Sequence, residues 1–157
     1  DLSTGVINEA SFRKFYEVAF ADSKRLHTDG SLLFICVENY ASALKDFGFN
    51  PTEKMMAGLA DLLSKVARAS DLVARLSNDT FCVMLLHTTW DNCQPVADTI
   101  FTQAQNITVL VDGDQISPEV EITASNFPNE GTDYLEALDQ GKRIAYRRIS
   151  PTDRQTA

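Results

Sequence analysis

Apolar positions along the chain follow two spacings, one typical of helices and one typical of strands. Apolar residues that recur at helical spacing predict helices, over residues 8–26, 39–47, 51–69, 93–105 and 131–146. Short and almost continuous apolar runs predict buried strands, over residues 31–37, 71–76, 80–86, 106–111 and 115–124. Polar turn residues at 77–79 and 112–114 separate two pairs of these strands, which predicts two hairpins.

The order of these elements predicts a single domain of the α+β class. We expect an α/β sandwich, in which helices pack on a mixed sheet of about five strands. We assign this domain to residues 1–150 and expect a flexible polar tail over residues 151–157. The chain opens directly on the first structural signal, which predicts that it is one piece of a longer, multidomain protein.

Composition narrows the classes of function that this domain can have. The 157 residues include 14 Lys and Arg but 22 Asp and Glu, for a formal net charge of −8, which argues against nucleic acid as a partner. No Lys or Arg occurs between Arg75 and Lys142, so any anion site must take its cations from outside that stretch. No apolar run reaches the ~18 residues that span a bilayer, which predicts no membrane contact. The three cysteines lack CxxC spacing, which favours a reducing cytoplasm over disulfides or zinc.

Two segments of the chain carry the motifs of a known family. Residues 1–12 (DLSTGVINEASF) resemble the opening of GGDEF domains, and residues 68–85 (RASDLVARLSNDTFCVML) resemble their central block. Residues 33–53 match the intervening strand, helix and turn without a gap, and residues 137–149 are similar to the closing segment. The resemblance covers nearly the whole chain. It implies the palm-like fold of nucleotide cyclases and polymerases, and a place in bacterial cyclic di-GMP signalling.

The resemblance also implies a metal site that this chain lacks. Active GGDEF domains are diguanylate cyclases, in which two domains each hold one GTP and join the nucleotides with the help of divalent metals. Such metals prefer carboxylate oxygens. The family's metal carboxylate at the end of the first strand corresponds here to Cys36, a soft ligand. Glu38, two residues further on, is either a replacement ligand or an acid at a helix start that faces water.

The family signature Gly-Gly-Asp-Glu-Phe corresponds here to residues 77–81, with the sequence SNDTF. Ser77 and Asn78 replace the two glycines, and their β-carbons should obstruct the close approach of backbone to phosphate. Asp79 keeps the acid at the third position, either as a remaining metal ligand or simply as a hairpin residue. Thr80 replaces the acid that follows.

Positions that contact the nucleotide in the family are changed as well. Leu44 stands where family members read guanine with Asn, and Glu53 stands where they use Asp. Lys142 keeps a phosphate-binding Lys. Ala41 and Tyr146 replace two cations of the family, a Lys and an Arg. Phe49 replaces a His.

One binding motif of the family is retained. Arg68 and Asp71 match the R-x-x-D of the family's inhibitory site, where the Arg grips a phosphate or guanine edge of cyclic di-GMP and the Asp accepts from guanine N–H groups. The alternative interpretation is an ion pair at a helix end with a purely structural role. The second Arg that the family usually adds is missing, because Thr99 or Phe101 stands at its position.

These residues predict a degenerate GGDEF-like domain without cyclase activity, metal or cofactor. We expect a regulatory or protein-interaction module whose partner is another domain of the same chain, of the sensor or phosphodiesterase type, or a separate protein. One alternative is a cyclic di-GMP receptor that binds through Arg68 and Asp71, and another is an active diguanylate cyclase. His27 and His87 lack spaced partners, and Trp90 is either an exposed anchor for a partner or a cap on the core.

Overall fold

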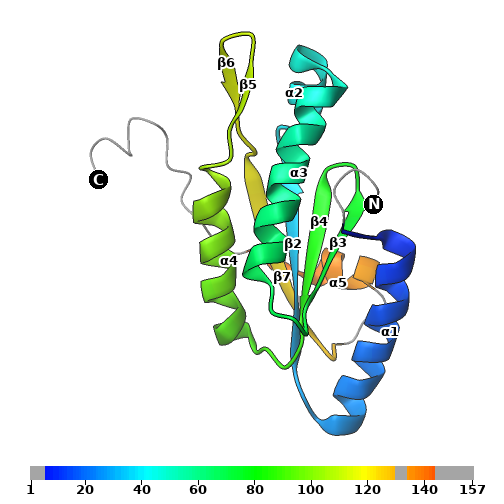
Figure 1. Cartoon of the computed structure of the whole chain (residues 1–157). Helices are drawn as coiled ribbons and strands as arrows, with labels where there is room; N and C mark the ends of the chain where they lie inside the picture. Colours follow the sequence, from blue (N-terminus) through cyan, green and yellow to red (C-terminus); the bar gives the residue numbers. More distant parts are fainter. Residues whose placement is uncertain (1–5, 130–133, 144–157) are drawn as a thin grey trace.

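A computed structural model describes residues 6–129 and 134–143, and Figure 1 shows how the elements are arranged. The helices are α1 (Glu9–Leu26), α2 (Tyr40–Phe47), α3 (Phe49–Val66), α4 (Trp90–Ala104) and α5 (Tyr134–Gln140). The strands are β1 (Ile7–Asn8), β2 (Gly30–Val37), β3 (Leu72–Ser77), β4 (Thr80–Leu85), β5 (Val109–Val111), β6 (Asp114–Ile116), β7 (Val120–Phe127) and β8 (Lys142–Arg143). The predicted tail, residues 151–157, lies outside the described residues.

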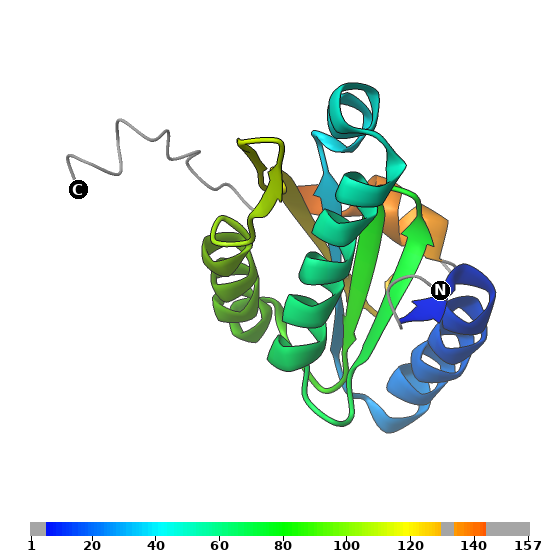
Figure 2. The ribbon, with the colours of Figure 1, turned by 45° about the horizontal axis from the view of Figure 1, so that its top comes forward.

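The main sheet is built around β2. Within the described residues its strand order is β1-β3-β4-β2-β7-β8, and β2 runs antiparallel to both of its neighbours, β4 and β7. The pair β1–β3 is parallel, so the sheet is mixed. Helices α3 and α4 cover one face of the sheet, and α1 and α5 cover the other (Figure 2). The predicted α+β sandwich is therefore confirmed, and its sheet consists of four long strands and two short edge strands.

Side chains of β2 alternate between the two faces of the sheet, as the pleat of a strand requires. Leu33, Ile35 and Val37 belong to the core beneath α3 and α4, whereas Leu32 and Phe34 belong to the core beneath α1 and α5. All five side chains are at most 2% exposed. Burial on both faces explains why this strand is a continuous apolar run in the sequence rather than an alternating one.

The predicted single strand over residues 115–124 is wrong, because this segment contributes to two different sheets. β6 pairs with β5 in a separate hairpin, whose turn residues Asp112 and Gly113 have the positive φ angles, 49° and 89°, that an Asp-Gly turn favours. The chain leaves this hairpin through Pro118, which has no N–H to donate to a strand ladder. β7 then enters the main sheet beside β2.

The helix predicted over residues 131–146 is shorter than expected. Within the described residues, α5 ends at Gln140 and the chain continues as β8, which pairs with β7. Gly141 stands at the break, where a β-carbon would lie 3.2 Å from the carbonyl oxygen of Ala137. The tight exit from the helix therefore favours glycine, and the prediction of a helix is wrong for the two residues of β8.

The close packing of Phe127 against Gly30, the first residue of β2, yields a test of the fold. A β-carbon at Gly30 would overlap the phenyl ring, so we expect Gly30→Ala to lower the free energy of unfolding by about 1–3 kcal/mol, measured by urea denaturation. Gly58→Ala in α3 is the matched control, because its β-carbon would lie 3.0 Å from the Cγ2 methyl group of Ile107, a far smaller overlap, and alanine favours the helix. Equal urea midpoints for Gly30→Ala and wild type would contradict this packing.

Candidate functional site

The residues at the family's catalytic positions meet at one end of the main sheet. The β3–β4 hairpin turns beside the end of β2, and the backbone N–H of Val37 donates to the carbonyl oxygen of Asp79 at 2.8 Å. In the strand register, Cys36 lies opposite Thr80 of β4 and opposite Glu121 of β7. Three neighbouring strands therefore place a thiol, a hydroxyl and a carboxylate side by side at this end.

The thiol of Cys36 lies in surroundings that disfavour its ionised form. Burial raises its pKa, and the carboxylates of Asp79, Glu121 and Glu38 raise the pKa further, whereas a hydrogen bond with Thr80 acts in the opposite direction. The thiol is therefore protonated at neutral pH, since even an unperturbed Cys has a pKa of about 8.5. A neutral sulfur is a poor ligand for a hard cation such as magnesium.

The carboxylate of Asp79 is hydrogen-bonded within its own hairpin. Its Oδ1 atom accepts from the hydroxyl of Ser77 at 3.1 Å and from the hydroxyl of Thr80 at 3.0 Å. Two of the residues that differ from the family signature thus supply the hydroxyls that hold the remaining acid. This geometry is that of a hairpin residue, the second of the two interpretations of Asp79.

The side chains at this end of the sheet do not form a ligand set for the magnesium that the family's chemistry requires. At one position where the family has a carboxylate, this chain has the thiol of Cys36, and at another it has the hydroxyl of Thr80. Glu38 is exposed to solvent beyond the end of β2. Hard divalent cations are bound by several oxygen ligands, usually carboxylates. Across the part of the chain that the structure describes, no group of three or more His, Cys, Asp or Glu side chains is arranged to hold a metal ion.

Glu53 of α3, at the family's guanine-reading position, forms a buried ion pair with Arg75 of β3. The Nη1 and Nη2 atoms of Arg75 donate to the two carboxylate oxygens at 2.8 and 2.9 Å, and the two side chains are only 8% and 13% exposed. The hydroxyl of Tyr40 also donates to Oε2 of Glu53 at 3.3 Å. Arg75 in addition donates through Nε to the carbonyl oxygen of Asn78 at 3.2 Å, so the pair ties α3 to the β3–β4 hairpin.

Sequence reasoning missed both partners of Glu53. Burial raises the pKa of Tyr40, and the carboxylate of Glu53 adds to the rise, so the hydroxyl stays protonated and remains a donor. The guanidinium of Arg75 also lies over the ring of Phe81, 5.7 Å from its centroid. One feature of the sequence marked Arg75 as a cation available to the site, because it is the last Lys or Arg before residue 142. No local pattern pointed to Tyr40.

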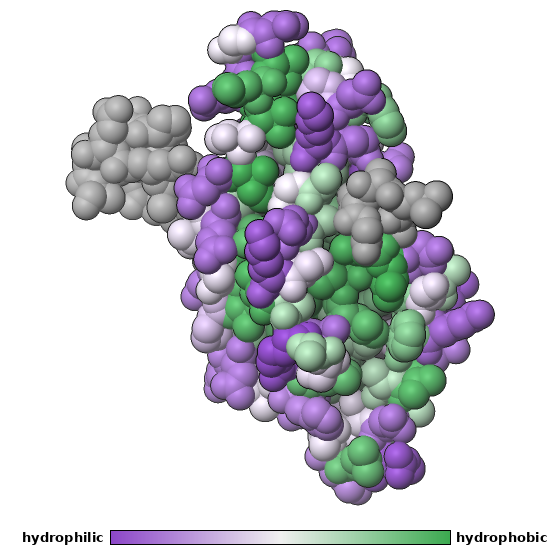
Figure 3. Space-filling view, viewed as in Figure 1, coloured by the Kyte–Doolittle hydropathy of each residue, from purple (hydrophilic) through white to green (hydrophobic). Residues whose placement is uncertain are grey.

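Two of the remaining nucleotide positions are exposed apolar side chains, and a third lies on an edge strand. Leu44 on α2 and Phe49 at the start of α3 are 38% and 62% exposed, at the end of the molecule where apolar side chains reach the surface in Figure 3. Lys142 lies on β8, where its backbone pairs with Ala124 of β7.

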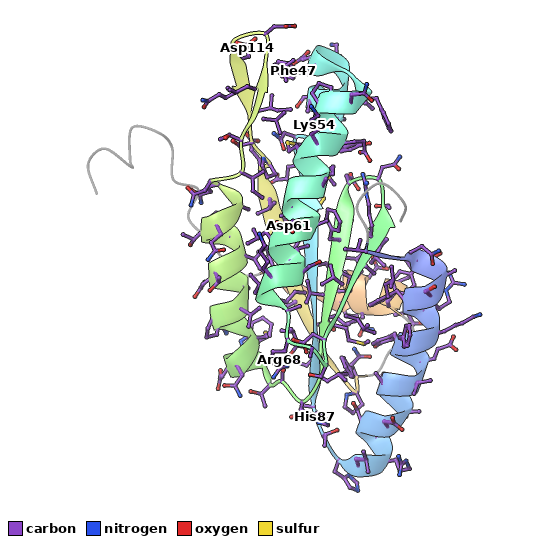
Figure 4. All side chains as sticks on the ribbon, in the orientation of Figure 1. Phe47, Lys54, Asp61, Arg68, His87 and Asp114 are labelled. Atoms are coloured by element: carbon purple, nitrogen blue, oxygen red, sulfur yellow. The ribbon has the colours of Figure 1, made fainter. Side chains whose placement is uncertain are left out.

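Arg68 and Asp71 lie at the opposite end of the sheet (Figure 4, label Arg68). The Nε and Nη2 atoms of Arg68 donate to the two carboxylate oxygens of Asp71, each at 3.0 Å. Nη2 also donates to the carbonyl oxygen of Leu86 at 2.8 Å and to the hydroxyl of Thr88 at 2.9 Å. The hydrogen bonds to Asp71 raise the pKa of Arg68, which keeps its charge throughout the accessible pH range.

Asp71 is satisfied entirely by the protein. Its side chain is 1% exposed, and besides the guanidinium it accepts from the backbone N–H of Arg68 at 2.8 Å and from that of Leu86 at 3.3 Å. A guanine N–H group could reach this carboxylate only by displacing one of these donors. The geometry is therefore that of a structural ion pair, one of the two interpretations of the motif.

The family profile "Diguanylate cyclase, GGDEF domain" matches residues 1–149. The chain belongs to the GGDEF family. This GGDEF domain is 24% identical over 139 residues to "Cyclic di-GMP phosphodiesterase NbdA" of Pseudomonas aeruginosa, a match over 88% of the chain and 18% of that protein. It is 26% identical over 109 residues to "Diguanylate cyclase DgcM" of Escherichia coli K12, over 69% of the chain and 27% of that protein. The domain thus spans less than a third of either relative.

The fold of this GGDEF domain also has a counterpart among solved structures. Diguanylate cyclase SiaD from Pseudomonas aeruginosa, in complex with its activator SiaC, superposes with a TM-score of 0.82 at 17% identity, over 89% of this chain and 54% of that one. At this identity the likeness shows the fold alone. Among the described helices, none has the length and apolar character to cross a membrane.

The buried pair at the guanine-reading position yields a stability prediction. Removal of one partner leaves an uncompensated buried charge, so we expect Glu53→Ala to lower the free energy of unfolding by about 3–5 kcal/mol, measured by urea denaturation at neutral pH. Asp61→Ala is the matched control, because it breaks an exposed pair with Lys65 on the same helix and should leave the urea midpoint nearly unchanged. Equal effects of the two substitutions would show that the Glu53 pair is not buried in solution.

Proposed function

We propose that this GGDEF domain is a catalytically inactive regulatory or protein-interaction domain in bacterial cyclic di-GMP signalling, located in the cytoplasm. One observation carries the proposal: the strand end where the family places its metal carboxylate holds the thiol of Cys36, opposite Thr80 and Glu121 in the sheet. Joining two nucleotides requires divalent cations that neutralise the charge of the transferring phosphates. With a thiol in place of the family's carboxylate, the domain lacks the ligand that would hold such a cation at this position.

The guanine-reading position supports the same conclusion. Both carboxylate oxygens of Glu53 accept from Arg75, and Tyr40 donates to one of them, so a guanine base would have to displace a buried ion pair. Leu44 has no polar side-chain atom that could replace the family's Asn. Loss of both base contacts removes the recognition that would position GTP for reaction.

The relatives support a role beside other domains or proteins. The region similar to this chain makes up 18% of the relative named as a cyclic di-GMP phosphodiesterase, so it is a small part of that protein. SiaD, which shares the fold, is described in complex with a protein activator. We therefore place this domain next to a sensor or phosphodiesterase domain of its own chain, or on a separate protein partner.

The absence of cyclase chemistry is directly testable. We expect no cyclic di-GMP when the protein is incubated with GTP and Mg²⁺ or Mn²⁺ and the products are separated by chromatography, because the metal ligands and base contacts are missing. DgcM of Escherichia coli is the positive control under the same conditions. We expect Cys36→Asp to remain inactive as well, since the Glu53–Arg75 pair is unchanged. Cyclic di-GMP formed by the wild-type protein would refute the proposal.

A cyclic di-GMP receptor is the second candidate, and one observation favours it. The side chain of Arg68 is 56% exposed and lies beside Asp71 at the family's R-x-x-D spacing. A ligand would have to compete with Asp71, the carbonyl group of Leu86 and the hydroxyl of Thr88 for this guanidinium. Helix α4, which carries the second Arg in the family, contains no Lys or Arg here, so the receptor ranks below the regulatory domain.

Calorimetry with cyclic di-GMP separates the two candidates. We expect no saturable heat with the wild-type protein, because the R-x-x-D groups are already paired with each other. Arg68→Ala is compared with Arg25→Ala, which removes an exposed cation from α1, and thermal denaturation checks that both variants are folded. Saturable binding that Arg68→Ala abolishes and Arg25→Ala preserves would transfer the assignment to the receptor.

A further inference from the structure

A cleft with a cavity volume of about 430 Å³ opens at the edge of the main sheet. It lies between the first turn of α4, the second half of β7 and the end of α5, and its lining residues are Trp90, Ala124, Ser125, Asn126, Asn129 and Gln140. In the β2–β7 register, Asn126 lies opposite Ser31 at the start of β2, five residues or about 16 Å along the strand from Cys36. The cleft is thus separate from the family's catalytic position, and its volume is that of a small-molecule site.

The lining of the cleft defines the kind of molecule that it can hold. Of the residues that the structure describes, the six that line the cleft carry no charge, so a phosphate or carboxylate group would find no ion-pair partner among them. Three of them are carboxamides, each of which both donates and accepts hydrogen bonds. Planar carboxamides are complementary to the adjacent donors and acceptors at the edge of a nucleobase.

Trp90 supplies the apolar surface of the cleft. It is the first residue of α4 and is half-buried against the core beneath α3 and α4, so it caps the core as one of its two interpretations predicted. The same residue also lines the cleft. An indole ring beside carboxamide groups is a combination that holds a flat aromatic ligand by stacking and reads its edge by hydrogen bonds.

Asn129 provides an acceptor for which the described residues offer no donor. Its Oδ1 atom is buried and has no hydrogen-bond partner. Its Nδ2 atom donates to the carbonyl oxygen of Asn126 at 2.9 Å and to the hydroxyl of Ser125 at 3.3 Å. Because a carbonyl oxygen can only accept, these contacts fix which end of the amide is the oxygen. A buried acceptor of this kind is costly unless a donor reaches it, and an N–H group of a ligand would be such a donor.

The wall of the cleft is held rigid by a chain of hydrogen bonds. The Nδ2 atom of Asn126 donates to the hydroxyl of Ser31 at 2.7 Å, and that hydroxyl donates to the carbonyl oxygen of Thr88 at 2.8 Å. The hydroxyl of Thr88 in turn accepts from Arg68 at 2.9 Å. A preformed wall loses little conformational freedom when a ligand binds, which favours recognition of a small rigid molecule.

We propose that this cleft binds a neutral nucleobase or nucleoside. The base stacks on the indole of Trp90, and an N–H group at its edge donates to Oδ1 of Asn129. The amide of Gln140 closes the cleft from α5 and pairs with the remaining edge of the base. The proposal is independent of the regulatory function proposed for the domain, because it uses none of the residues at the Cys36 end of β2.

The single tryptophan of the chain makes the proposal directly measurable. Adenosine, guanosine, cytidine and uridine are titrated into the ¹⁵N-labelled protein, and the indole N–H signal, which can only be that of Trp90, is followed by NMR. We expect a saturable shift with at least one nucleoside and none with ribose. Glucose and N-acetylglucosamine test whether the tryptophan instead binds sugars. No saturable shift with any nucleoside, or stronger binding of a sugar, would overturn the proposal.

Two variants and one control locate the binding. We expect Asn129→Ala and Gln140→Ala each to weaken nucleoside binding by about tenfold, the scale of a lost contact to a base. Gln140 is exposed at the end of α5, so this variant tests the site even if Asn129→Ala reduces stability. Gln103→Ala, an exposed position in the last turn of α4, should leave the affinity unchanged. Affinities that stay unchanged in Gln140→Ala and folded Asn129→Ala would overturn the proposed site.

Discussion

The structure depends on the burial of β2 on both of its faces. Because the strand pairs with β4 on one side and β7 on the other, its register determines which side chains meet at each end of the sheet. At the end of β2, Cys36 meets Thr80 and Glu121. At its start, Ser31 joins Thr88 to Asn126 through hydrogen bonds of 2.8 and 2.7 Å. One strand therefore organises both ends: its apolar middle forms the core, and its end residues Ser31 and Cys36 carry the polar contacts.

The two ends share a further property, which is that each holds a carboxylate paired with an arginine of the same chain. Glu53 is held by Arg75 at one end, and Asp71 is held by Arg68 at the other. A group that is already paired in the folded state has little to gain from a ligand, because each new contact replaces an existing one. By contrast, the buried Oδ1 atom of Asn129 has no partner among the described residues, and it belongs to neither ion pair but to a cleft whose described lining residues are uncharged.

The sequence predicts the helices and strands, whose signals are local. It misses the contacts between residues that are far apart in the chain. Helical spacing and the apolar run of β2 predicted the sandwich, and the Asp-Gly turn at 112–113 predicted its hairpin. The split between β6 and β7 was missed because the apolar pattern continues across Pro118, although the hydrogen-bond ladder cannot. Arg68 and Asp71 are three residues apart, so their pairing could be weighed in advance as one interpretation of the motif. The partner of Glu53 comes from another element, and no spacing rule connects the two.

The Glu53–Arg75 pair constrains the order in which substitutions can accumulate at this position. If the acid changes first, the guanidinium keeps the carbonyl oxygen of Asn78 but loses its counter-charge, and if the arginine changes first, the carboxylate keeps the hydroxyl of Tyr40 but loses its counter-charge. Either path passes through a poorly folded intermediate, so the two residues can change only together. In this chain, the demands of folding alone are therefore enough to account for an acid at the position where the family reads guanine.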